Sequence, residues 1–340
     1  MKKLIPNIFI VLLVSSCSNE AIYESFIFDN PEIELSIPID FPVLNNSFYT
    51  NKPTKYGIEL GEKLFFDKKL SRDNSISCAS CHIPENAFAD HNSKGIGIDG
   101  RVGLRNPPPI QNMAFMQVYN WEGSKSKLEN QPLVPIITPE EMDASILDII
   151  EKIEQDDDYI ELFKKTFGDD DITGDRIYKS IAQYEYTLIS ANSKYDRVQN
   201  ENDTFTESEA QGYQTFQEKC ISCHSTALFT DQSYRNIGFP INPDNEETGR
   251  TRVSLNSDDL MRFRVPSLRN IEYTAPYGSF GQFATLEEVL DYLDNGVLEA
   301  DNLDPILKDN NNRIPLSEEE KSNLIAFMKT LSDTEFIGLQ

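Results

Sequence analysis

The 340-residue sequence is poor in basic residues, in histidine and in tryptophan, and its N-terminal apolar run is too short to cross a membrane as a permanent helix. Lysine and arginine total 31 against 56 aspartates and glutamates, which gives a formal net charge of −25. So acidic a surface repels nucleic acid and suits a basic protein partner, although the same charges also serve solubility alone. The composition therefore predicts a chain without a nucleic-acid partner.

Cysteine is also scarce, and the first of the five cysteines lies near the N-terminus. The segment MKKLIPNIFIVLLVSSCSNE begins with basic residues, continues with the apolar run 5–14 and has small residues directly before Cys17, as secretory signals do. The tetrad VSSC that ends in Cys17 resembles a bacterial lipobox, in which the cysteine is diacylated. We therefore expect residues 1–16 to be a lipoprotein signal peptide and Cys17 to anchor a periplasmic protein to a membrane. Simple cleavage nearby, without the lipid, is the alternative.

The other four cysteines form two CxxC pairs, and a histidine follows each pair directly. The motif CASCH contains Cys78, Cys81 and His82, and the motif CISCH contains Cys220, Cys223 and His224. A zinc site built from both pairs would leave the histidines without a role, and thioredoxin-like chemistry needs a βαβ setting that neither motif has. A c-type haem uses all three side chains, because the thiols bond to the porphyrin and the histidine binds the iron. The sequence therefore predicts two covalently bound c-type haems.

Helical patterns surround both motifs, which suggests a distant internal duplication, and strand signals are few. Apolar residues recur at helical spacing in 56–67 before the first motif and in 209–220 before the second. Further amphipathic helices are expected within 139–168, 173–190 and 316–331. Thr173 and Ser317 are the expected N-caps, and Glu320 completes a capping box. We expect an all-α protein of two cytochrome c-like domains, each with one haem.

The chain is also longer than one hydrophobic core usually requires, which favours two domains. The polar stretch 190–210 is typical of a linker between them. After the signal peptide we expect a tether and lead-in at 17–48, an N-terminal haem domain at 49–196 and a C-terminal haem domain at 197–340.

Several longer motifs accompany the two haem motifs. They are LGEKLFFDKKLSRDNSISCASCH, FAD, RNPPPIQN, PEEM, FRVPSLRNIEYTAPYGSFGQF and LEEVL, in that order. Together they resemble the bacterial dihaem cytochrome c peroxidase and MauG superfamily, from about Tyr56 to Leu331. The resemblance implies that the haem on His82 reacts with peroxide and that the haem on His224 receives electrons. It also implies a homodimer, which is common in the family.

The resemblance further implies three catalytic residues. Cleavage of hydrogen peroxide needs an open iron site and a group that moves a proton between the two oxygens. In the family this group is the glutamate of an EM pair, Glu141 here, and its helper glutamine is Gln131. Trp121, the only tryptophan, matches the family tryptophan between the haems. The alternatives are an acid in the first turn of a helix that begins near Pro139, a surface amide and an ordinary core tryptophan.

The family also places a calcium ion between its domains, on one asparagine side chain and two backbone carbonyls. The matching positions are Asn106, Thr274 and Pro276. Amide and carbonyl oxygens suit calcium, which prefers hard ligands. A proline-rich turn between the domains, without the ion, is the alternative.

The sequence departs from the family pattern at the first haem. Many dihaem peroxidases have an SxGHG loop whose histidine caps the resting peroxidatic iron, but here the loop reads SKGIG, with Ile96 at that position. Isoleucine cannot bind iron, so we expect the haem on His82 to be open and active without prior reduction. His91 is the one remaining histidine that could replace the missing cap.

The ligand opposite His224 is a second departure. Family members have a methionine there or, in MauG-type members, a tyrosine, in the helix after TLEEV. The aligned residue is Leu293, and Tyr292 stands one residue before it. One step along a helix turns a side chain by about 100°. Tyr292 is therefore one hypothesis for the iron ligand, beside Met261, a vacant site and a misaligned helix.

The leading prediction is a periplasmic peroxidase that reduces hydrogen peroxide to water with electrons from a basic cytochrome c or another small donor. The first alternative is a MauG-like oxidase that acts on a protein or an organic substrate, and the loss of the methionine ligand favours it. The second is an electron carrier or gas sensor without catalysis, which the presence of both Glu141 and Gln131 disfavours.

Overall fold

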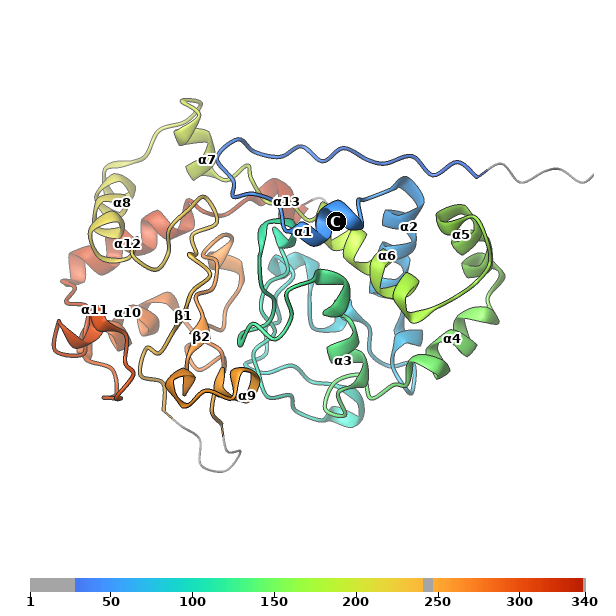
Figure 1. The fold of residues 1–340 in the computed structure, drawn as a ribbon. Helices are drawn as coiled ribbons and strands as arrows, with labels where there is room; N and C mark the ends of the chain where they lie inside the picture. The colour runs from blue at the N-terminus through green and yellow to red at the C-terminus, as the bar shows by residue number, and fades with distance from the viewer. Residues whose placement is uncertain (1–27, 241–246, 339–340) are drawn as a thin grey trace, which may run out of the picture.

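The structure is a computed structural model that describes residues 28–240 and 247–338. The expected signal peptide and the lipidation residue Cys17 lie outside the described residues. Within them the chain is mostly helical, and its strands form one short antiparallel pair in the second half (Figure 1). No helix of this described part is long and apolar enough to span a membrane. The mostly helical character expected from the sequence is confirmed.

The helices are connected by 3₁₀ turns and loops. The first half of the chain contains α1 (Asn46–Thr50), α2 (Lys55–Phe66), α3 (Leu133–Ile137), α4 (Ile146–Glu154), α5 (Asp157–Phe167), α6 (Gly174–Thr187) and α7 (Lys194–Gln199). The second half contains α8 (Glu207–Lys219), α9 (Thr251–Ser254), α10 (Leu286–Asn295), α11 (Pro305–Lys308), α12 (Glu318–Lys329) and α13 (Thr334–Gly338). Strand β1 (Tyr234–Arg235) pairs with β2 (Phe263–Arg264), so Tyr234 lies opposite Arg264.

Most of the helices expected from the sequence are present, with small shifts at their ends. Helix α2 covers most of 56–67, α8 covers most of 209–220, and α12 lies inside 316–331. The Ser317 side chain caps α12 and Glu320 completes the capping box, as predicted. Local signals were sufficient for these helices because each has its own cap and its own apolar stripe.

Two expectations need correction. The stretch 139–168 is helical only from Ile146 onward, in α4 and α5, so the interpretation of Glu141 as an acid in a first helical turn is wrong. The stretch 190–210, expected to be a linker, contains α7, whose Asp196 pairs with the buried Arg269 at 2.7 Å. In both places contacts from distant parts of the chain override the local pattern.

A helix pair with a glycine at its contact forms the centre of each half. In the first half α2 packs against α6, and a Cβ on Gly61 would overlap the carbonyl oxygen of Ser180. In the second half α8 packs against α12, and a Cβ on Gly212 would overlap the carbonyl oxygen of Asn323. Separate clusters of buried apolar side chains surround the two pairs. Each helix that precedes a CxxCH motif is thus held by the same kind of close contact.

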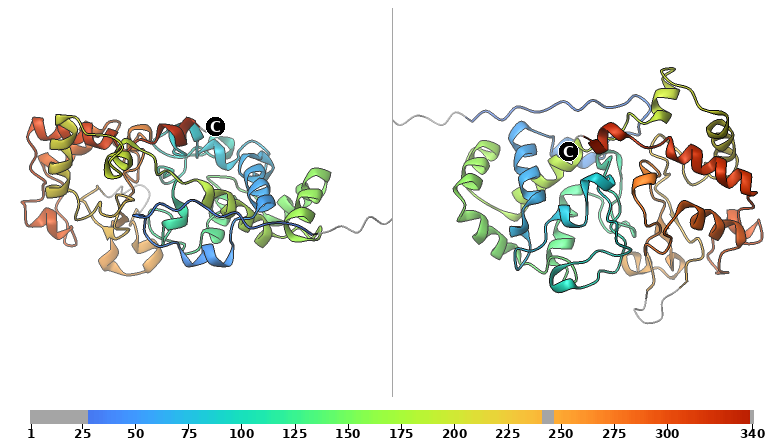
Figure 2. Two further views of the ribbon diagram at one scale, coloured as in Figure 1. Left: turned by 90° about the horizontal axis from the view of Figure 1, so that it is seen from above. Right: turned by 180° about the vertical axis from the view of Figure 1, so that it is seen from behind.

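The segment 28–45, here named the lead-in segment, runs as an extended chain across both halves (Figures 1 and 2). In the first half, Nδ2 of Asn30 donates to the carbonyl of Thr166 at 2.9 Å. In the second half, the guanidinium of Arg269 lies 4.7 Å from the ring centroid of Phe41. The lead-in segment therefore contacts both halves before the first helix begins.

The C-terminal end also crosses between the halves. Helix α13 follows α12 in the sequence, yet its Phe336 is buried in the apolar cluster of the first half. The domains expected at 49–196 and 197–340 remain a prediction. Helix α13 lies in the second of these ranges but packs against the first.

Replacement of Gly61 or Gly212 by alanine places a methyl group against a backbone carbonyl that cannot move without its helix. We expect each substitution to lower the free energy of unfolding by roughly 1–3 kcal/mol, measured from urea unfolding of the holoprotein. Gly338→Ala is the matched control, because a methyl group on Gly338 would meet no described residue within 4 Å. Equal stability of G61A and G338A would contradict the packing argument.

Candidate functional site

The first CxxCH motif forms a 3₁₀ turn. Ser77 and Ser80 form a capping box around the turn that begins at Cys78, and the backbone N–H of His82 donates to the carbonyl of Cys78 at 2.9 Å. The Nδ1 atom of His82 lies 3.1 Å from the carbonyl oxygen of Phe88. This hydrogen bond needs a proton on Nδ1, which leaves the lone pair of Nε2 free to bind a metal.

The second motif repeats this arrangement at the end of α8. The N–H of His224 donates to the carbonyl of Cys220 at 3.0 Å, and Nδ1 of His224 lies 3.0 Å from the carbonyl oxygen of Phe229. Phe88 and Phe229 have positive φ angles, of 60° and 55°, at the points where the chain turns back toward the imidazoles. Burial lowers the pKa of both histidines. Each motif therefore presents a neutral imidazole of defined tautomer.

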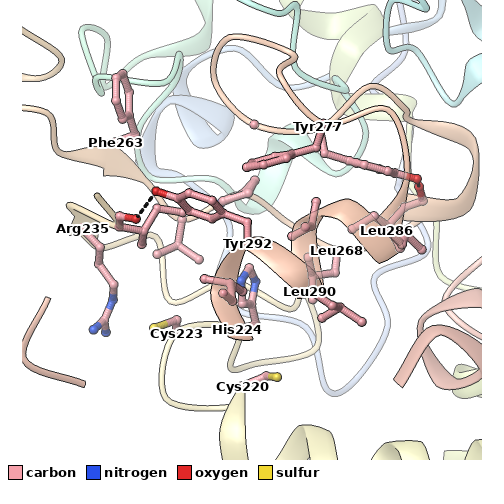
Figure 3. A pocket seen from close by; sticks show the side chains of 18 of the residues that line it. Cys220, Cys223, His224, Arg235, Phe263, Leu268, Tyr277, Leu286, Leu290 and Tyr292 are labelled. Atoms are coloured by element: carbon pink, nitrogen blue, oxygen red, sulfur yellow. Dashed lines mark hydrogen bonds between the residues drawn. The ribbon is translucent and has the colours of Figure 1, made fainter. Parts of the chain in front are cut away.

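A cavity of about 250 Å³ lies against the second motif (Figure 3). Its wall contains Cys220, Cys223 and His224, and the remaining wall is mostly apolar. The apolar side chains include Phe216, Phe239, Phe263, Leu268, Ile271, Leu286, Leu290, Leu324 and Met328. Both cysteines are free thiols, and burial raises the pKa of Cys220 to about 12. An apolar cavity with two free thiols and a neutral imidazole fits a c-type haem.

Tyr292 also lies in the wall of this cavity, on α10, and so does its neighbour Leu293. The hydroxyl of Tyr292 donates to the carbonyls of Ile237 and Gly238, at 3.1 and 2.7 Å, and Figure 3 draws one of these two hydrogen bonds. Burial raises the pKa of Tyr292 to about 12. Met261 is not among the residues that line the cavity and is buried in an aromatic cluster beside it. The hypothesis of Tyr292 as an iron ligand stays a prediction, with its hydroxyl bonded to the backbone here.

Glu141 lies in a turn between α3 and α4 that is held from two sides. The next residue, Met142, is buried in the apolar cluster of the first half. The carbonyl of Glu141 accepts a hydrogen bond from the N–H of Ile98 at 2.9 Å. Burial raises the pKa of the Glu141 carboxyl to about 7, and the nearby Glu140 adds to this shift. Glu141 therefore changes between its protonated and ionised forms near neutral pH.

The loop that carries Ile96 lies between Glu141 and the first motif. A Cβ on Gly97 would overlap the backbone of Glu141, and a Cβ on Gly95 would lie 3.8 Å from Sγ of Cys81. Ile96 itself is 43% exposed. The loop thus brings Glu141 close to the first pair of thiols.

His91, the one histidine considered as a substitute cap, lies five residues before Ile96. Its side chain is 67% exposed, and its Nδ1 is 3.9 Å from the carboxyl of the buried Asp90. These contacts are those of a loop histidine at the surface, and a capping role for His91 stays a prediction.

Gln131 lies in the wall of a smaller cavity of about 40 Å³. Its Nε2 donates to Oδ1 of Asn120 at 3.3 Å, and the side chains of Glu185 and Arg264 contribute to the same wall. Glu141 is not among the described residues that line this cavity. The structure therefore places Glu141 and Gln131 in the same half, and of the two only Gln131 lies in the wall of this cavity.

Glu185 is a titratable residue that sequence reasoning did not select. It is 5% exposed on α6, and burial raises its pKa to about 8. The sequence signal that could have identified Glu185 is its place, as an acid, among the buried positions of the helix predicted in 173–190.

Trp121 and the three residues expected to bind calcium lie together at the larger cavity. Nε1 of Trp121 donates to the carbonyl of Asn106 at 2.8 Å, and Asn106, Thr274 and Pro276 all line the cavity wall. The carbonyl of Ser279 accepts from the N–H of Asn106 at 3.1 Å, whereas its buried hydroxyl has no hydrogen-bond partner among the described residues. An unpaired buried oxygen beside Asn106 fits a nearby cation, and the calcium ion itself stays a prediction.

The structure gives no support to a zinc site or to a redox disulfide at the CxxC pairs. Within residues 28–240 and 247–338, no three or more His, Cys, Asp or Glu side chains gather in a group that could hold a metal ion. The four cysteines of the two motifs are also free, so neither pair forms a disulfide.

Comparisons with known proteins identify the family to which this chain belongs. The model of the di-haem cytochrome c peroxidase family matches residues 55–204. The chain is 30% identical to the methylamine utilization protein MauG of Methylophilus methylotrophus over 309 residues, 88% of each chain. It is 35% identical to the cytochrome c551 peroxidase of Nitrosomonas europaea over 279 residues, 81% of this chain and 79% of the relative.

Solved structures agree with this result. A MauG-like protein associated with microbial copper homeostasis matches with a TM-score of 0.80 and 28% identity, over 90% of this chain and 97% of the other. The diheme peroxidase BthA of Burkholderia thailandensis shares the fold, with a TM-score of 0.74 over 85% of this chain and 89% of the other at 23% identity. From its relatives and its fold, the chain belongs to the di-haem cytochrome c peroxidase and MauG family of oxidoreductases.

Proposed function

We propose that this chain is a peroxidase that reduces hydrogen peroxide to water with electrons from a small redox protein. The observation that carries the proposal is a carboxyl of pKa about 7, that of Glu141, held beside a CxxCH motif whose histidine has a free nitrogen. We assign one c-type haem to Cys78, Cys81 and His82 and another to Cys220, Cys223 and His224. When bound, the haems supply redox chemistry at iron.

In this proposal Glu141 moves the proton. Reduction of peroxide to water breaks the bond between the two oxygens and consumes protons and electrons in equal numbers. The ionised carboxyl takes a proton from one peroxide oxygen and gives it to the other, which leaves as water, and the remaining oxygen takes up two electrons and two protons to become the second water. A pKa near neutrality suits this cycle because the same group must accept a proton and then release it.

Gln131 and Trp121 have supporting roles in the proposal. Gln131 orients the peroxide, and Asn120 in turn orients the Gln131 amide. Trp121 lies in the wall of the larger cavity and assists electron transfer between the haems. Pro109 lines both this cavity and the smaller one, whose wall contains Gln131.

For the partners we propose a basic cytochrome c as the electron donor, because the net charge of −25 attracts a basic protein. The name of the cytochrome c551 peroxidase relative supports a cytochrome donor. We further propose a periplasmic homodimer that a lipid on Cys17 anchors to a membrane, with a calcium ion at Asn106, Thr274 and Pro276.

The second candidate function is a MauG-like oxidation of a protein or an organic substrate. It is favoured by helix α10, which contributes Tyr292 and Leu293 to the cavity wall around His224 and contains no methionine. MauG relatives at 30% and 34% identity support it as well.

Turnover of cytochrome c separates the two functions. Enzyme that is fully oxidised, and enzyme reduced beforehand at one haem, are each mixed with reduced cytochrome c and hydrogen peroxide. Equal and fast oxidation of cytochrome c by both is the result expected for a peroxidase with an open first haem. Absence of turnover in both, while peroxide still shifts the Soret band, would contradict the peroxidase and favour the MauG-like oxidase.

Substitution Glu141→Gln removes the group that moves the proton, so we expect kcat/KM for peroxide to fall by about 10²–10⁴-fold. In the wild type the rate rises as the pH increases through about 7, because the ionised carboxyl is the form that first accepts a proton. E141Q loses this dependence on pH. Glu140→Gln, at the exposed neighbouring acid, is the control: it keeps the maximal rate and a dependence on pH, whose midpoint moves to lower pH because the Glu140 charge adds to the raised pKa of Glu141. An unchanged profile in E141Q is the result that rejects the assignment.

Substitution Ile96→His restores a side chain that can bind iron. We expect the oxidised wild type to give a high-spin ferric signal in electron paramagnetic resonance and I96H to lose most of that signal. If about 90% of the I96H molecules are closed, turnover without prior reduction falls about tenfold. Ile96→Val is the control that keeps the wild-type spectrum. Two low-spin haems in the oxidised wild type would show that the first haem is already capped.

A further inference from the structure

Arg264 is buried without a carboxylate partner. It is 6% exposed, and within the described residues no aspartate or glutamate oxygen lies within 4.0 Å of its guanidinium. Every other arginine of the chain forms at least one such ion pair with a described residue. Arg264 is therefore the exception in a structure that otherwise pairs its guanidinium groups.

The hydrogen bonds of Arg264 do not compensate its charge. Its Nε donates to the carbonyl of Asn120 at 3.3 Å and its Nη1 to the carbonyl of Val265 at 3.4 Å, both longer than a usual N–H···O bond. A buried charge without an opposite charge is strongly unfavourable. Burial lowers the pKa of Arg264 to about 10, so the guanidinium is still charged at neutral pH. Among the described residues, no carboxylate balances this charge.

The position of Arg264 indicates where a balancing anion binds. The side chain lies in the wall of the larger cavity, with His224, and also in the wall of the smaller cavity. Strand β2 fixes its backbone, because the N–H of Arg264 donates to the carbonyl of Trp121 at 2.7 Å. Arg235 lies in the wall of the larger cavity too, but its guanidinium already pairs with carboxylates at 2.7 and 2.8 Å. Arg264 is thus the arginine of this wall that is available to a ligand.

We propose that Arg264 is a positioning residue that binds a propionate group of the haem on His224 and raises the reduction potential of that haem. The inference rests on the proposed haem at this motif. Propionates are ionised carboxylates, and the planar fork of a guanidinium matches them in shape and charge. The positive charge favours the reduced haem because the iron loses one positive charge when it accepts an electron.

The test compares Arg264→Lys and Arg264→Met in the full-length holoprotein. Lysine and methionine have similar unbranched side chains, and only lysine keeps the charge. Haem content is measured first, and the reduction potentials of both haems are then measured by spectroelectrochemistry. We expect one of the two reduction steps to shift to lower potential in R264M and to stay near the wild-type value in R264K. Arg262→Gln is the matched control, because Arg262 lies two residues away and pairs with Asp259 at 3.6 Å. It leaves both steps unchanged.

A variant that lacks the first pair of thiols, with Cys78 and Cys81 replaced by serine, assigns the shifted step. It keeps the haem on His224, so the shift caused by Arg264→Met persists in this background. A shift confined to the other haem overturns the assignment, and so do equal shifts in R264K and R264M or no shift in a fully loaded R264M. Absence of haem from the second motif of the wild type overturns the proposed function together with this inference.

Discussion

In each CxxCH motif, the hydrogen bond from the histidine to a phenylalanine carbonyl fixes the protonation and the orientation of the imidazole. It holds a proton on Nδ1, selects the tautomer and stops the rotation of the ring. The acceptors depend on the cores, because the ring of Phe88 packs against Phe65 and Phe336, and the ring of Phe229 packs against Phe216. Core packing is therefore the origin of the imidazole geometry. A destabilised core in either half would therefore displace the carbonyl that orients the histidine of that half.

Ion pairs connect the two elements that define the first site. Arg101 lies in the loop that carries Ile96, and it donates to Asp143 at 3.0 Å and to the carbonyl of Pro139 at 2.8 Å. These acceptors flank Glu141 in the chain. Ile96 and Glu141, to which we assign the open iron site and the proton transfer, therefore belong to one small unit whose two parts cannot shift independently.

Local signals account for most of what could be predicted from the sequence. The CxxCH motifs and α12 with its capping box carry their information within a few residues, and the family resemblance agrees with the comparisons. Helix α7 was missed although Ser193 and Asp196 form a capping box, because it is only 6 residues long within a polar stretch, and its Asp196 is also held by Arg269, 73 residues away. Arg264 could not be predicted either. In the sequence around FRVPSLRN, Arg262, Arg264 and Arg269 cannot be told apart. Tertiary contacts leave Arg262 partly exposed, bury Arg264 without an ion pair to a described residue, and pair the buried Arg269 with Asp196.

The lead-in segment restrains the motion of the two halves. It is bonded to Thr166 on one half and packed under Arg269 on the other, so the two halves cannot turn relative to each other without stretching or detaching this chain. Tension applied to the N-terminal end of the lead-in segment reaches first the contacts at Thr166 and only then those at Arg269. A pull from that end would therefore detach Asn30 from Thr166 before it loads Phe41 at Arg269, and it would reach last the hydrogen bonds of Asn45 to Ala114 and Met116 in the first half.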